Sequence, residues 1–449
     1  MNRIHDYYRP VEERKNDFKE VERRLSYEEL KPQVERCMNC GLPFCHGEGC
    51  PLGNLVPDQN RAVAAGDMKR AYELLSANSD FPEWTSRICP ALCESCCVHQ
   101  LDEESVMIRQ TEKLIIETAF EKGWVVPRPP KKENGKSAAV IGAGPAGLSA
   151  AITLRRRGWK VTVYEKEREI GGLIRYGIPY FKLDKAVIDR RRKILEAEGV
   201  VFVTGTEIGK DISAEYLAKA HDEVVVAIGT PAARDLKIPG RDLKGVHLAL
   251  EYLSGENKAI GGEIAANPIN AKGKRVLVIG GGDTGSDCVG TAIRQGAASV
   301  TQIEIMPKPP AERSPSTPWP MWPYMLRTSS SHLEGCNREW NLNSLRFLGR
   351  KNVLGVEVET VKWEFSPAGK PLKFAPVEGT KRVIDADLVL LAMGFTGVPQ
   401  DNPIVRQLNI AQTPRTALVS NPAANIYCVG DCANGASLVV RALASGKAI

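Results

Sequence analysis

The chain has 449 residues, which is too long for one ordinary hydrophobic core and favours two or three domains. Its 60 basic and 54 acidic residues give a net charge of +6, a mild excess that excludes the strongly basic character of a nucleic-acid-binding protein. Residues 1–26 are charged throughout and contain no apolar run typical of a secretory signal. We therefore expect the reducing cytoplasm, where clustered thiols are more often metal ligands than disulfides.

The N-terminal part of the chain is rich in cysteine. Eight of the twelve cysteines form two runs, Cys37-x2-Cys40-x4-Cys45-x4-Cys50-Pro51 and Cys89-Pro90-x2-Cys93-x2-Cys96-Cys97. Short repeated spacings, with a proline directly after a cysteine, are typical of iron–sulfur ligation, and zinc is the alternative metal. Amphipathic runs at 61–76 and 106–120 accompany the cysteines. Residues 1–130 are therefore expected to form a helical, metal-binding domain.

A proline-rich, charged linker at 127–136 ends this part of the chain, because it can propagate neither a helix nor a central strand. Two basic clusters beyond it, at 155–157 and 190–193, lie on predicted helices and are interpreted as solvated helix faces. The residues after the linker have the periodicity of alternating strands and helices. They predict an α/β fold.

A first dinucleotide-binding unit follows the linker. A strand at 137–141, a glycine turn, a helix at 148–157 and a strand ending at Glu165 form a βαβ unit. In the turn, Gly142 permits the tight bend, Gly144 lets the backbone approach a pyrophosphate, and Gly147 allows the helix to pack closely on the strand. Glu165 would accept hydrogen bonds from ribose hydroxyls. The complete pattern is far more specific than an isolated glycine motif.

The same pattern returns with strands at 275–279 and 299–306. Lys308 and Arg313 follow the second of these strands and suit a ribose 2′-phosphate, which favours NADPH over NADH. Glu304 would favour NADH, but it precedes the expected end of the strand. The alternative is that both cations are merely exposed. The expected NADPH-binding residues are Gly280, Gly282, Asp283, Thr284, Gly285, Lys308 and Arg313.

The first unit is the better candidate for a flavin. The glycine-containing segment 171–185 follows it, and a late strand at 426–429 ends at Gly430 and Asp431, where a carboxylate suits a ribityl or phosphate group. A helix beginning near Ser437 would stabilise negative charge on a reduced flavin; in isolation, Gly430-Asp431 is also an ordinary turn. The expected FAD-binding residues are Gly142, Gly144, Pro145, Ala146, Gly147, Glu165, Lys166, Gly172, Leu173, Arg175, Gly430, Asp431, Ser437, Leu438 and Val439.

Apolar strands predicted at 387–392 and 426–429 indicate that the chain returns to the first fold after completing the second. The expected fold class is therefore α/β, with a helical iron–sulfur domain followed by two Rossmann-like domains, of which the FAD domain is discontinuous. The expected ranges are 1–130 for the iron–sulfur domain, 137–253 with 396–449 for the FAD domain, and 254–395 for the NADPH domain.

This combination resembles the small (beta) subunits of NADPH-dependent glutamate synthase, within a wider flavin and iron–sulfur family that includes the N-terminal part of dihydropyrimidine dehydrogenase. The resemblance covers nearly the whole chain. It is carried by CMNCGLPFCHGEGCPLGNLVPD, RICPALCESCCV, VIGAGPAGLSAA, GGLIRYGIPYFKLDK, VLVIGGGDTGSDCVG and PSTPWPMWPYMLRTSSSHLEGCNREW. Members of the family continue the last helix beyond the position of Ile449, so less packing on the flavin domain is expected here.

The resemblance implies two 4Fe-4S clusters in the N-terminal domain. One would be held by Cys37, Cys40, Cys45 and Cys97, and the other by Cys50, Cys89 and Cys93, which leaves Cys96 spare. Related proteins place a non-cysteine oxygen ligand at the remaining position, and Glu112 is the candidate. The alternative is that Glu112 is a solvated acid on an amphipathic helix.

The resemblance also implies a function. NADPH would give a hydride to FAD, and electrons would pass through the clusters to a separate large (alpha) subunit that makes glutamate from glutamine and 2-oxoglutarate. No catalytic acid or base is expected, because hydride transfer mainly requires stacked rings. An NADPH:ferredoxin-type oxidoreductase and a zinc-stabilised nucleotide-binding scaffold are the alternatives. Neither a nucleic-acid nor a membrane partner is expected.

Overall fold

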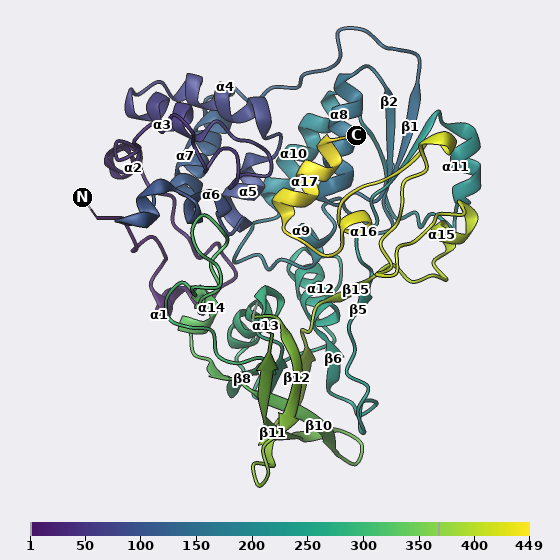
Figure 1. Cartoon of the computed structure of the whole chain (residues 1–449). Coiled ribbons are helices and arrows are strands. Elements are labelled where there is room, and N and C mark those ends of the chain that lie inside the picture. The colour runs from purple at the N-terminus through teal and green to yellow at the C-terminus, as the bar shows by residue number, and fades with distance from the viewer. Residues whose placement is uncertain (1, 367–368) are drawn as a thin grey trace.

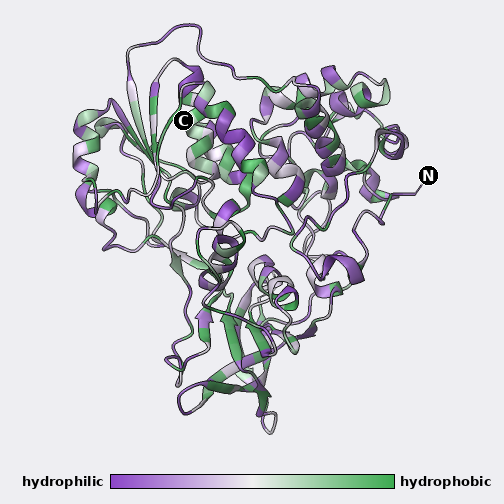
Figure 2. Cartoon of the chain, turned by 180° about the vertical axis from the view of Figure 1, so that it is seen from behind, coloured by the Kyte–Doolittle hydropathy of each residue, from purple (hydrophilic) through white to green (hydrophobic). Residues whose placement is uncertain are grey.

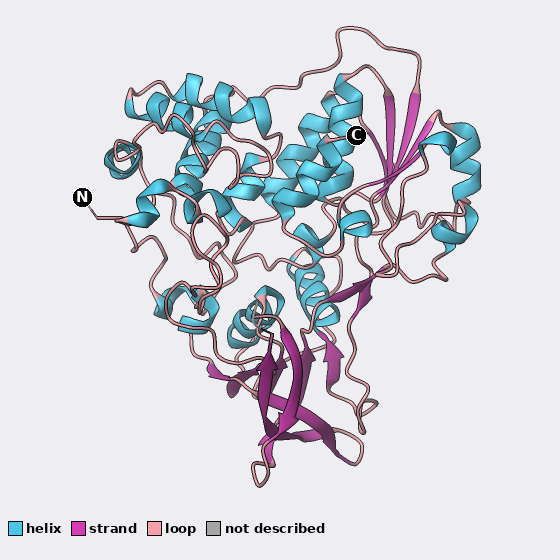
Figure 3. Ribbon diagram, in the orientation of Figure 1, coloured by secondary structure: helices cyan, strands magenta, loops and turns pink. Residues whose placement is uncertain are grey.

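The computed structural model describes residues 2–366 and 369–449. It has a helical N-terminal part and two parts that are each built around a sheet (Figures 1 and 3). No helix within the described ranges is both long and apolar enough to cross a membrane. The α/β class expected from the sequence is confirmed.

The N-terminal part consists of short helices joined by the cysteine-bearing loops. They are α1 (Val11–Arg14), α2 (Tyr27–Val34), α3 (Val56–Ala64), α4 (Met68–Asn78), α5 (Pro82–Ile88), α6 (Leu92–Ser95), the 3-10 helix η1 (Val98–Leu101) and α7 (Ile108–Glu121). The single run expected at 61–76 is wrong. Gly66 has a φ of +78° and Asp67 caps α4 by accepting from the Arg70 amide at 2.9 Å, so two helices form.

The first sheet is parallel and buried on both faces. Its strand order is β16-β4-β1-β2-β3, made by β1 (Ser137–Ile141), β2 (Lys160–Tyr164), β3 (Val201–Val203), β4 (Glu223–Val226) and β16 (Ile426–Cys428). Side chains of β1 alternate between the two faces: Ala138 and Val140 join one hydrophobic core, and Ala139 and Ile141 join another. This arrangement is typical of a sheet covered by helices on both sides.

Helices cover the two faces of the first sheet differently. One core includes side chains from α8 (Pro145–Arg156), α10 (Ala186–Ala197) and α17 (Val439–Lys447). The other includes side chains from α11 (Ala214–Ala220), α15 (Pro403–Gln407) and α16 (Asp431–Asn434). The short α9 (Leu173–Tyr176) follows β2, and the 3-10 helix η2 (Pro422–Ala424) precedes β16. The last helix, α17, therefore packs on the same core as the first glycine turn.

The second sheet repeats this design. Its order is β6-β14-β7-β8-β9, from β6 (Val246–Leu248), β7 (Arg275–Ile279), β8 (Ser299–Ile303), β9 (Asn337–Glu339) and β14 (Leu388–Leu391), with helices α12 (Ala249–Ile260), α13 (Asp283–Arg294) and α14 (Ser330–Leu333). The strands of this sheet are largely hydrophobic (Figure 2). Because β6 pairs with β14, the second part begins before the boundary expected at 253/254.

The strand expected at 387–392 corresponds to β14 and belongs to the second sheet, so only β16 returns to the first. The two crossings between the sheets lie side by side, because β5 (Ala232–Ala233) pairs with β15 (Phe395–Gly397). An antiparallel sheet of β10 (Leu342–Gly349), β11 (Val353–Phe365), β12 (Pro371–Pro376) and β13 (Arg382–Asp385) extends the second part away from the first and was not predicted (Figure 1).

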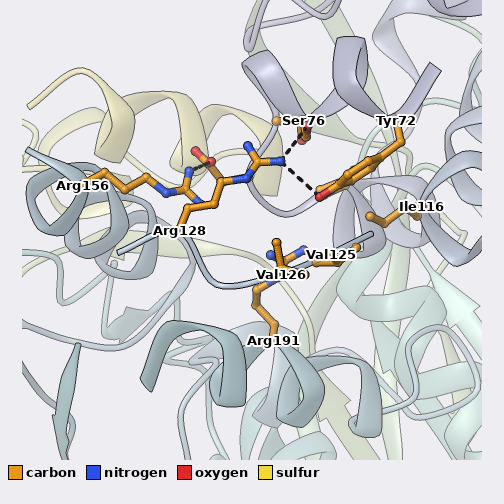
Figure 4. Close-up of a pocket in the computed structure, with 11 residues that line it drawn as sticks. Tyr72, Ser76, Ile116, Val125, Val126, Arg128, Arg156 and Arg191 are labelled. Atoms are coloured by element: carbon orange, nitrogen blue, oxygen red, sulfur yellow. Dashed lines mark hydrogen bonds and ion pairs between the residues drawn. The ribbon is translucent and has the colours of Figure 1, made fainter. Parts of the chain in front are cut away.

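The helical part docks on the first sheet through buried charges. Arg191 of α10 donates from Nε and Nη2 to the Glu83 carboxylate of α5 at 2.6 and 2.8 Å. Arg155 is also buried and donates from Nε to the Glu198 carbonyl at 2.7 Å. Arg155, Arg156, Arg190 and Arg191 are thus engaged in internal contacts, whereas Arg157 and Lys193 are exposed, so the interpretation of the two clusters as solvated faces is only partly correct. The linker crosses a cavity at this junction, where Arg128 reaches Tyr72 and Ser76 (Figure 4).

Candidate functional site

The first thiol group lines one cavity of the N-terminal part. The cysteines on its wall are Cys37, Cys40, Cys45 and Cys97. Burial, and next the proximity of Cys97 and Cys37, raise the pKa of Cys45 to about 12. Sequence reasoning grouped the same four residues, although Cys97 lies far along the chain from the others. Three of them, Cys37, Cys45 and Cys97, pack against Val56, Val106 and Ile108.

The second thiol group gathers around Glu112, which α7 presents. Burial, with a contribution from the nearby Glu112 carboxylate, raises the pKa of Cys50, Cys89 and Cys93, in the case of Cys89 to about 11. The exposed fraction of Glu112 is only 7%, and Asn54 Nδ2 donates to its Oε1 at 2.8 Å. Burial raises the pKa of Glu112 to about 7. Glu112 is therefore buried beside the thiols, and the solvated-acid alternative is wrong.

Both groups have the donor chemistry of an iron–sulfur site. Burial raises the pKa of five of these thiols and so favours their neutral form, and a bound metal centre would supply the positive charge that makes thiolates stable; the five are Cys45, Cys50, Cys89, Cys93 and Cys97. Within residues 2–366 and 369–449, no three His, Cys, Asp or Glu side chains converge on a single metal position. The first four thiols instead line the wall of a cavity.

Cys96 does not line the cavity of the first thiol group. It is buried, and its Sγ donates to the Leu92 carbonyl oxygen at 3.0 Å. Burial raises the pKa of Cys96 to about 11, which agrees with a protonated donor. A Cβ on Gly49 would overlap the Cys96 sulfur, so glycine is needed at that position. Cys96 thus fills space between the two cysteine runs.

The first glycine turn has the geometry of a dinucleotide-binding loop. Gly142 has a φ of +106°, and a Cβ there would lie 2.5 Å from the Ala227 carbonyl oxygen. A Cβ on Gly147 would overlap the Gly142 carbonyl oxygen, whereas Gly144 faces open space. Helix α8 begins at Pro145 after the Gly144 cap. Its first amides are therefore available to a pyrophosphate.

Glu165 follows β2 directly and is 6% exposed. It accepts from the Ala143 amide at 2.8 Å and from the Glu167 amide at 3.0 Å. These two bonds hold the carboxylate beside the glycine turn. Each oxygen retains a second lone pair for a ribose hydroxyl.

The other predicted flavin residues do not all share this location. Gly172 approaches the Gly144 backbone, and Gly430 approaches the Ala146 side chain, so both close on the first turn. Asp431 accepts from Ser437 Oγ at 2.8 Å. Leu438 precedes helix α17, which begins at Val439. Lys166 and Leu173 are exposed. Arg175 is instead occupied within the fold, because its Nε donates to the Ile170 carbonyl at 2.6 Å and it pairs with Asp189.

The second glycine turn repeats the first. Gly280 has a φ of +120°, a Cβ on Gly285 would overlap the Gly280 carbonyl oxygen, and Gly282 caps α13 and faces open space. Asp283 and Thr284 form the first residues of that helix. The chain therefore presents two helix N-termini suited to phosphates.

Glu304 is the counterpart of Glu165. Strand β8 ends at Ile303, so the expectation that Glu304 precedes the end of its strand is wrong. Its carboxylate accepts from the Gly281 amide at 2.6 Å and from the Met306 amide at 3.1 Å, the same pattern that Glu165 makes. Glu304 thus occupies the ribose-facing position of the second fold.

The two predicted phosphate ligands are placed differently. Lys308 lies over the Trp340 ring, with Nζ 5.2 Å from the centroid. Arg313 donates to the carbonyl oxygens of Thr317, Met321 and Ser95 at 3.2, 2.6 and 3.1 Å. Its guanidinium is therefore used at a junction with the N-terminal part, and Lys308 is the better phosphate candidate.

Sequence reasoning missed Asn54 and Trp319. Asn54 bonds Glu112, and Trp319 donates from Nε1 to the Cys97 carbonyl at 3.3 Å. Neither belongs to a recognisable spacing, so only the fold reveals them. Glu304 had a usable signal, because it follows its glycine turn at nearly the same distance as Glu165.

Two dinucleotide-binding folds and a thiol-lined helical part define a flavin- and nicotinamide-dependent oxidoreductase with an iron–sulfur domain. Comparisons with known proteins agree. Residues 14–124 match the family described as dihydropyrimidine dehydrogenase domain II, 4Fe-4S cluster, and residues 136–317 match pyridine nucleotide-disulphide oxidoreductase. The solved structure of Mycobacterium tuberculosis FprA in complex with NADPH shares the fold, with a TM-score of 0.55 and 17% identity over 71% of this chain and 83% of that one.

Full-length relatives are more specific. The glutamate synthase [NADPH] small chain of M. tuberculosis is 46% identical over 98% of this chain and 91% of its own, and that of Bacillus subtilis is 40% identical over 97% and 92%. The chain is also 40% identical to glutamate synthase [NADH] of Saccharomyces cerevisiae, of which it spans 21%. The chain belongs to the glutamate synthase small-chain family.

Gly144 and Gly147 of the first turn allow a prediction. Gly147→Ala should destabilise the protein and abolish flavin binding, because its methyl group overlaps the Gly142 carbonyl. Gly144→Ala should leave the midpoint of thermal unfolding of the apoprotein unchanged but lower FAD affinity at least tenfold, because its methyl group points into open space beside the pyrophosphate position. Unfolding followed by circular dichroism and flavin titration measure the two effects. Equal flavin affinity for Gly144→Ala and wild type would contradict the assignment.

Proposed function

We propose that this chain is the electron-input subunit of a glutamate synthase. It oxidises NADPH and passes the electrons to a separate large subunit, which forms glutamate from glutamine and 2-oxoglutarate. The observation that carries this proposal is the presence, in one chain, of two dinucleotide-binding turns and two groups of partly buried thiols. The names of the full-length relatives support the choice of partner reaction.

The described residues fit the cofactors that this function requires. FAD would lie on the turn at Gly142–Gly147, NADPH on that at Gly280–Gly285, and one 4Fe-4S cluster in each thiol group, with Glu112 as the eighth ligand. When bound, FAD accepts the hydride of NADPH and the clusters carry electrons one at a time. The N-termini of α8 and α13 would bind the pyrophosphates, and Glu165 and Glu304 would orient the riboses. The reducing cytoplasm suits such thiols.

The partner reaction is tested with the purified, anaerobically reconstituted chain and a glutamate synthase large subunit. We expect the pair to form glutamate from glutamine and 2-oxoglutarate at the expense of NADPH, whereas neither chain does so alone. Rapid reduction of ferredoxin without glutamate formation would support an NADPH:ferredoxin-type oxidoreductase instead. A colourless, iron-free preparation that contains zinc would support a nucleotide-binding scaffold.

Nucleotide preference is proposed to depend on Lys308. Lys308 is the cation proposed to attract the 2′-phosphate, whereas the Glu304 carboxylate at the ribose position would favour the free 2′-hydroxyl of NADH and oppose this preference. Lys308→Ala should lower kcat/KM for NADPH about tenfold, equivalent to about 1.4 kcal/mol, and leave that for NADH unchanged. Lys272→Ala is the control, because Lys272 is exposed and precedes the amino end of β7, whereas Lys308 follows the carboxyl end of the parallel strand β8. Equal losses with both nucleotides would refute this role.

Glu112 is proposed as a ligand of the second cluster. Glu112→Ala should remove about half of the bound iron and leave the FAD content unchanged, because one of two sites loses a ligand. Glu112→Cys should restore the iron with an altered electron paramagnetic resonance (EPR) spectrum. Glu121→Ala, at the exposed end of the same helix, is the control. Wild-type iron content and spectrum in Glu112→Ala would exclude the ligand role.

A further inference from the structure

We propose that a segment of the nucleotide-binding part positions the cysteine loops of the first thiol group, and that Trp319 is the positioning residue. The segment comprises residues 313–327 and is called the strap below. The inference rests on the proposed function only in that a 4Fe-4S cluster occupies the first thiol group. It assigns to the strap a role that the two nucleotide sites do not require.

The tip of the strap contacts both cysteine loops that line the cavity. Trp319 Nε1 donates to the carbonyl oxygen of Cys97 at 3.3 Å. The Trp319 ring packs against Phe44, with centroids 4.6 Å apart and an interplanar angle of 55°. Phe44 precedes Cys45 and itself lines the cavity. One indole therefore contacts a ligand residue in the second cysteine run and the neighbour of a ligand in the first.

Arg313 provides a second attachment. Its Nη2 donates to the Ser95 carbonyl at 3.1 Å, two residues before Cys97, while Nη1 donates to carbonyl oxygens of Thr317 and Met321 within the strap. A guanidinium shared between both sides fixes the strap against the segment from Ser95 to Cys97. The contact is thus a built junction, with a charged and an aromatic anchor.

The base of the strap is held by the nucleotide-binding fold. Two backbone hydrogen bonds join the two ends of the strap. The Ser314 amide donates to the Tyr324 carbonyl at 3.0 Å, and the Leu326 amide donates to the carbonyl of Pro310, just before the strap, at 2.7 Å. Just beyond it, Ser329 Oγ lies 2.6 Å from Ser286 Oγ on α13. The strap therefore connects the cysteine loops to α13, the helix that follows the second glycine turn.

The strap is expected to position the cysteine ligands because the cysteine loops have few fixed contacts of their own. Apart from Pro57 of α3, the cavity wall is formed by loops and the short 3-10 helix η1, and Met38 and Leu42 on the first loop are 52% and 84% exposed. Such segments have little regular hydrogen bonding of their own to fix ligand positions. Hydrogen bonds and apolar cover next to ligands orient them, limit solvent access and set a cluster's potential. Trp319 supplies both.

The test compares reconstituted wild type with Trp319→Ala, Trp319→Phe and Trp322→Ala. Trp319→Phe keeps an aromatic ring and removes the N–H. Trp322 is the matched control, because it lies in the same strap, is 37% exposed and stacks on Arg327 at 3.9 Å. The measurements are EPR spectra of the reduced proteins, iron and FAD content, and the rate at which each cluster signal is lost in air.

We expect Trp319→Ala to shift one of the two cluster signals and to hasten its loss in air at least threefold, while the other signal and the FAD content stay as in wild type. Trp319→Phe should shift the same signal with a smaller change in its lifetime in air. This variant tests the role of Trp319 if the alanine variant does not fold. Trp322→Ala should match wild type. Wild-type spectra and lifetimes in both Trp319 variants would overturn the positioning role of Trp319 and leave the proposed function standing. Changes in Trp322→Ala equal to those in Trp319→Ala would do the same. A wild type without iron would overturn the proposed function as well.

Discussion

The ion pair between Glu83 and Arg191 is the contact on which the arrangement of the molecule depends. Both side chains are almost fully buried, with exposures of 0% and 5%, and two hydrogen bonds of 2.6 and 2.8 Å join them. Removing one partner of such a pair costs about 3–5 kcal/mol, since the other charge stays buried. Helix α5 carries Glu83 and ends just before Cys89, and its neighbours Phe81 and Trp84 belong to the core of the first sheet. The second thiol group is therefore built directly onto the candidate flavin fold.

The second nucleotide fold is attached to the N-terminal part by a different set of contacts. Glu334 accepts from Arg14 at 2.8 Å and from Arg294 at 2.5 Å, which joins the N-terminal arm to α13. The strap adds Trp319 and Arg313 on the far side of the cysteine loops. The two nucleotide parts contact each other through the β5–β15 ribbon and through ion pairs such as Lys258–Glu167 at 2.8 Å and Lys182–Asp287, and the N-terminal part adds a further connection that spans both.

Much of this architecture was predictable because it rests on local constraints. The glycine turns and their terminal acids have few conformational solutions, so Gly142, Gly147 and Glu165 could be assigned a place from spacing alone. The grouping of Cys97 with Cys37 came from family resemblance, since nothing in local sequence predicts a contact across so many residues. The uses of Arg175 and Arg313 could not be foreseen, because a guanidinium that satisfies backbone carbonyls has no spacing signature. The antiparallel sheet at β10–β13 was missed because its strands are partly exposed and lack the buried apolar runs that mark β7 and β14.

The discontinuity of the first sheet has a consequence for how the protein is made. Strand β4 lies at the edge of that sheet until β16 arrives, and β16 is separated from it by the whole of the second part. The Ala146 turn meets Gly430 and Gly446, which belong to the last segment of the chain. During synthesis the second sheet can therefore form before the first is complete. The dinucleotide cradle at Gly142 is therefore completed by residues 426–446, which follow the whole of the second part in the sequence.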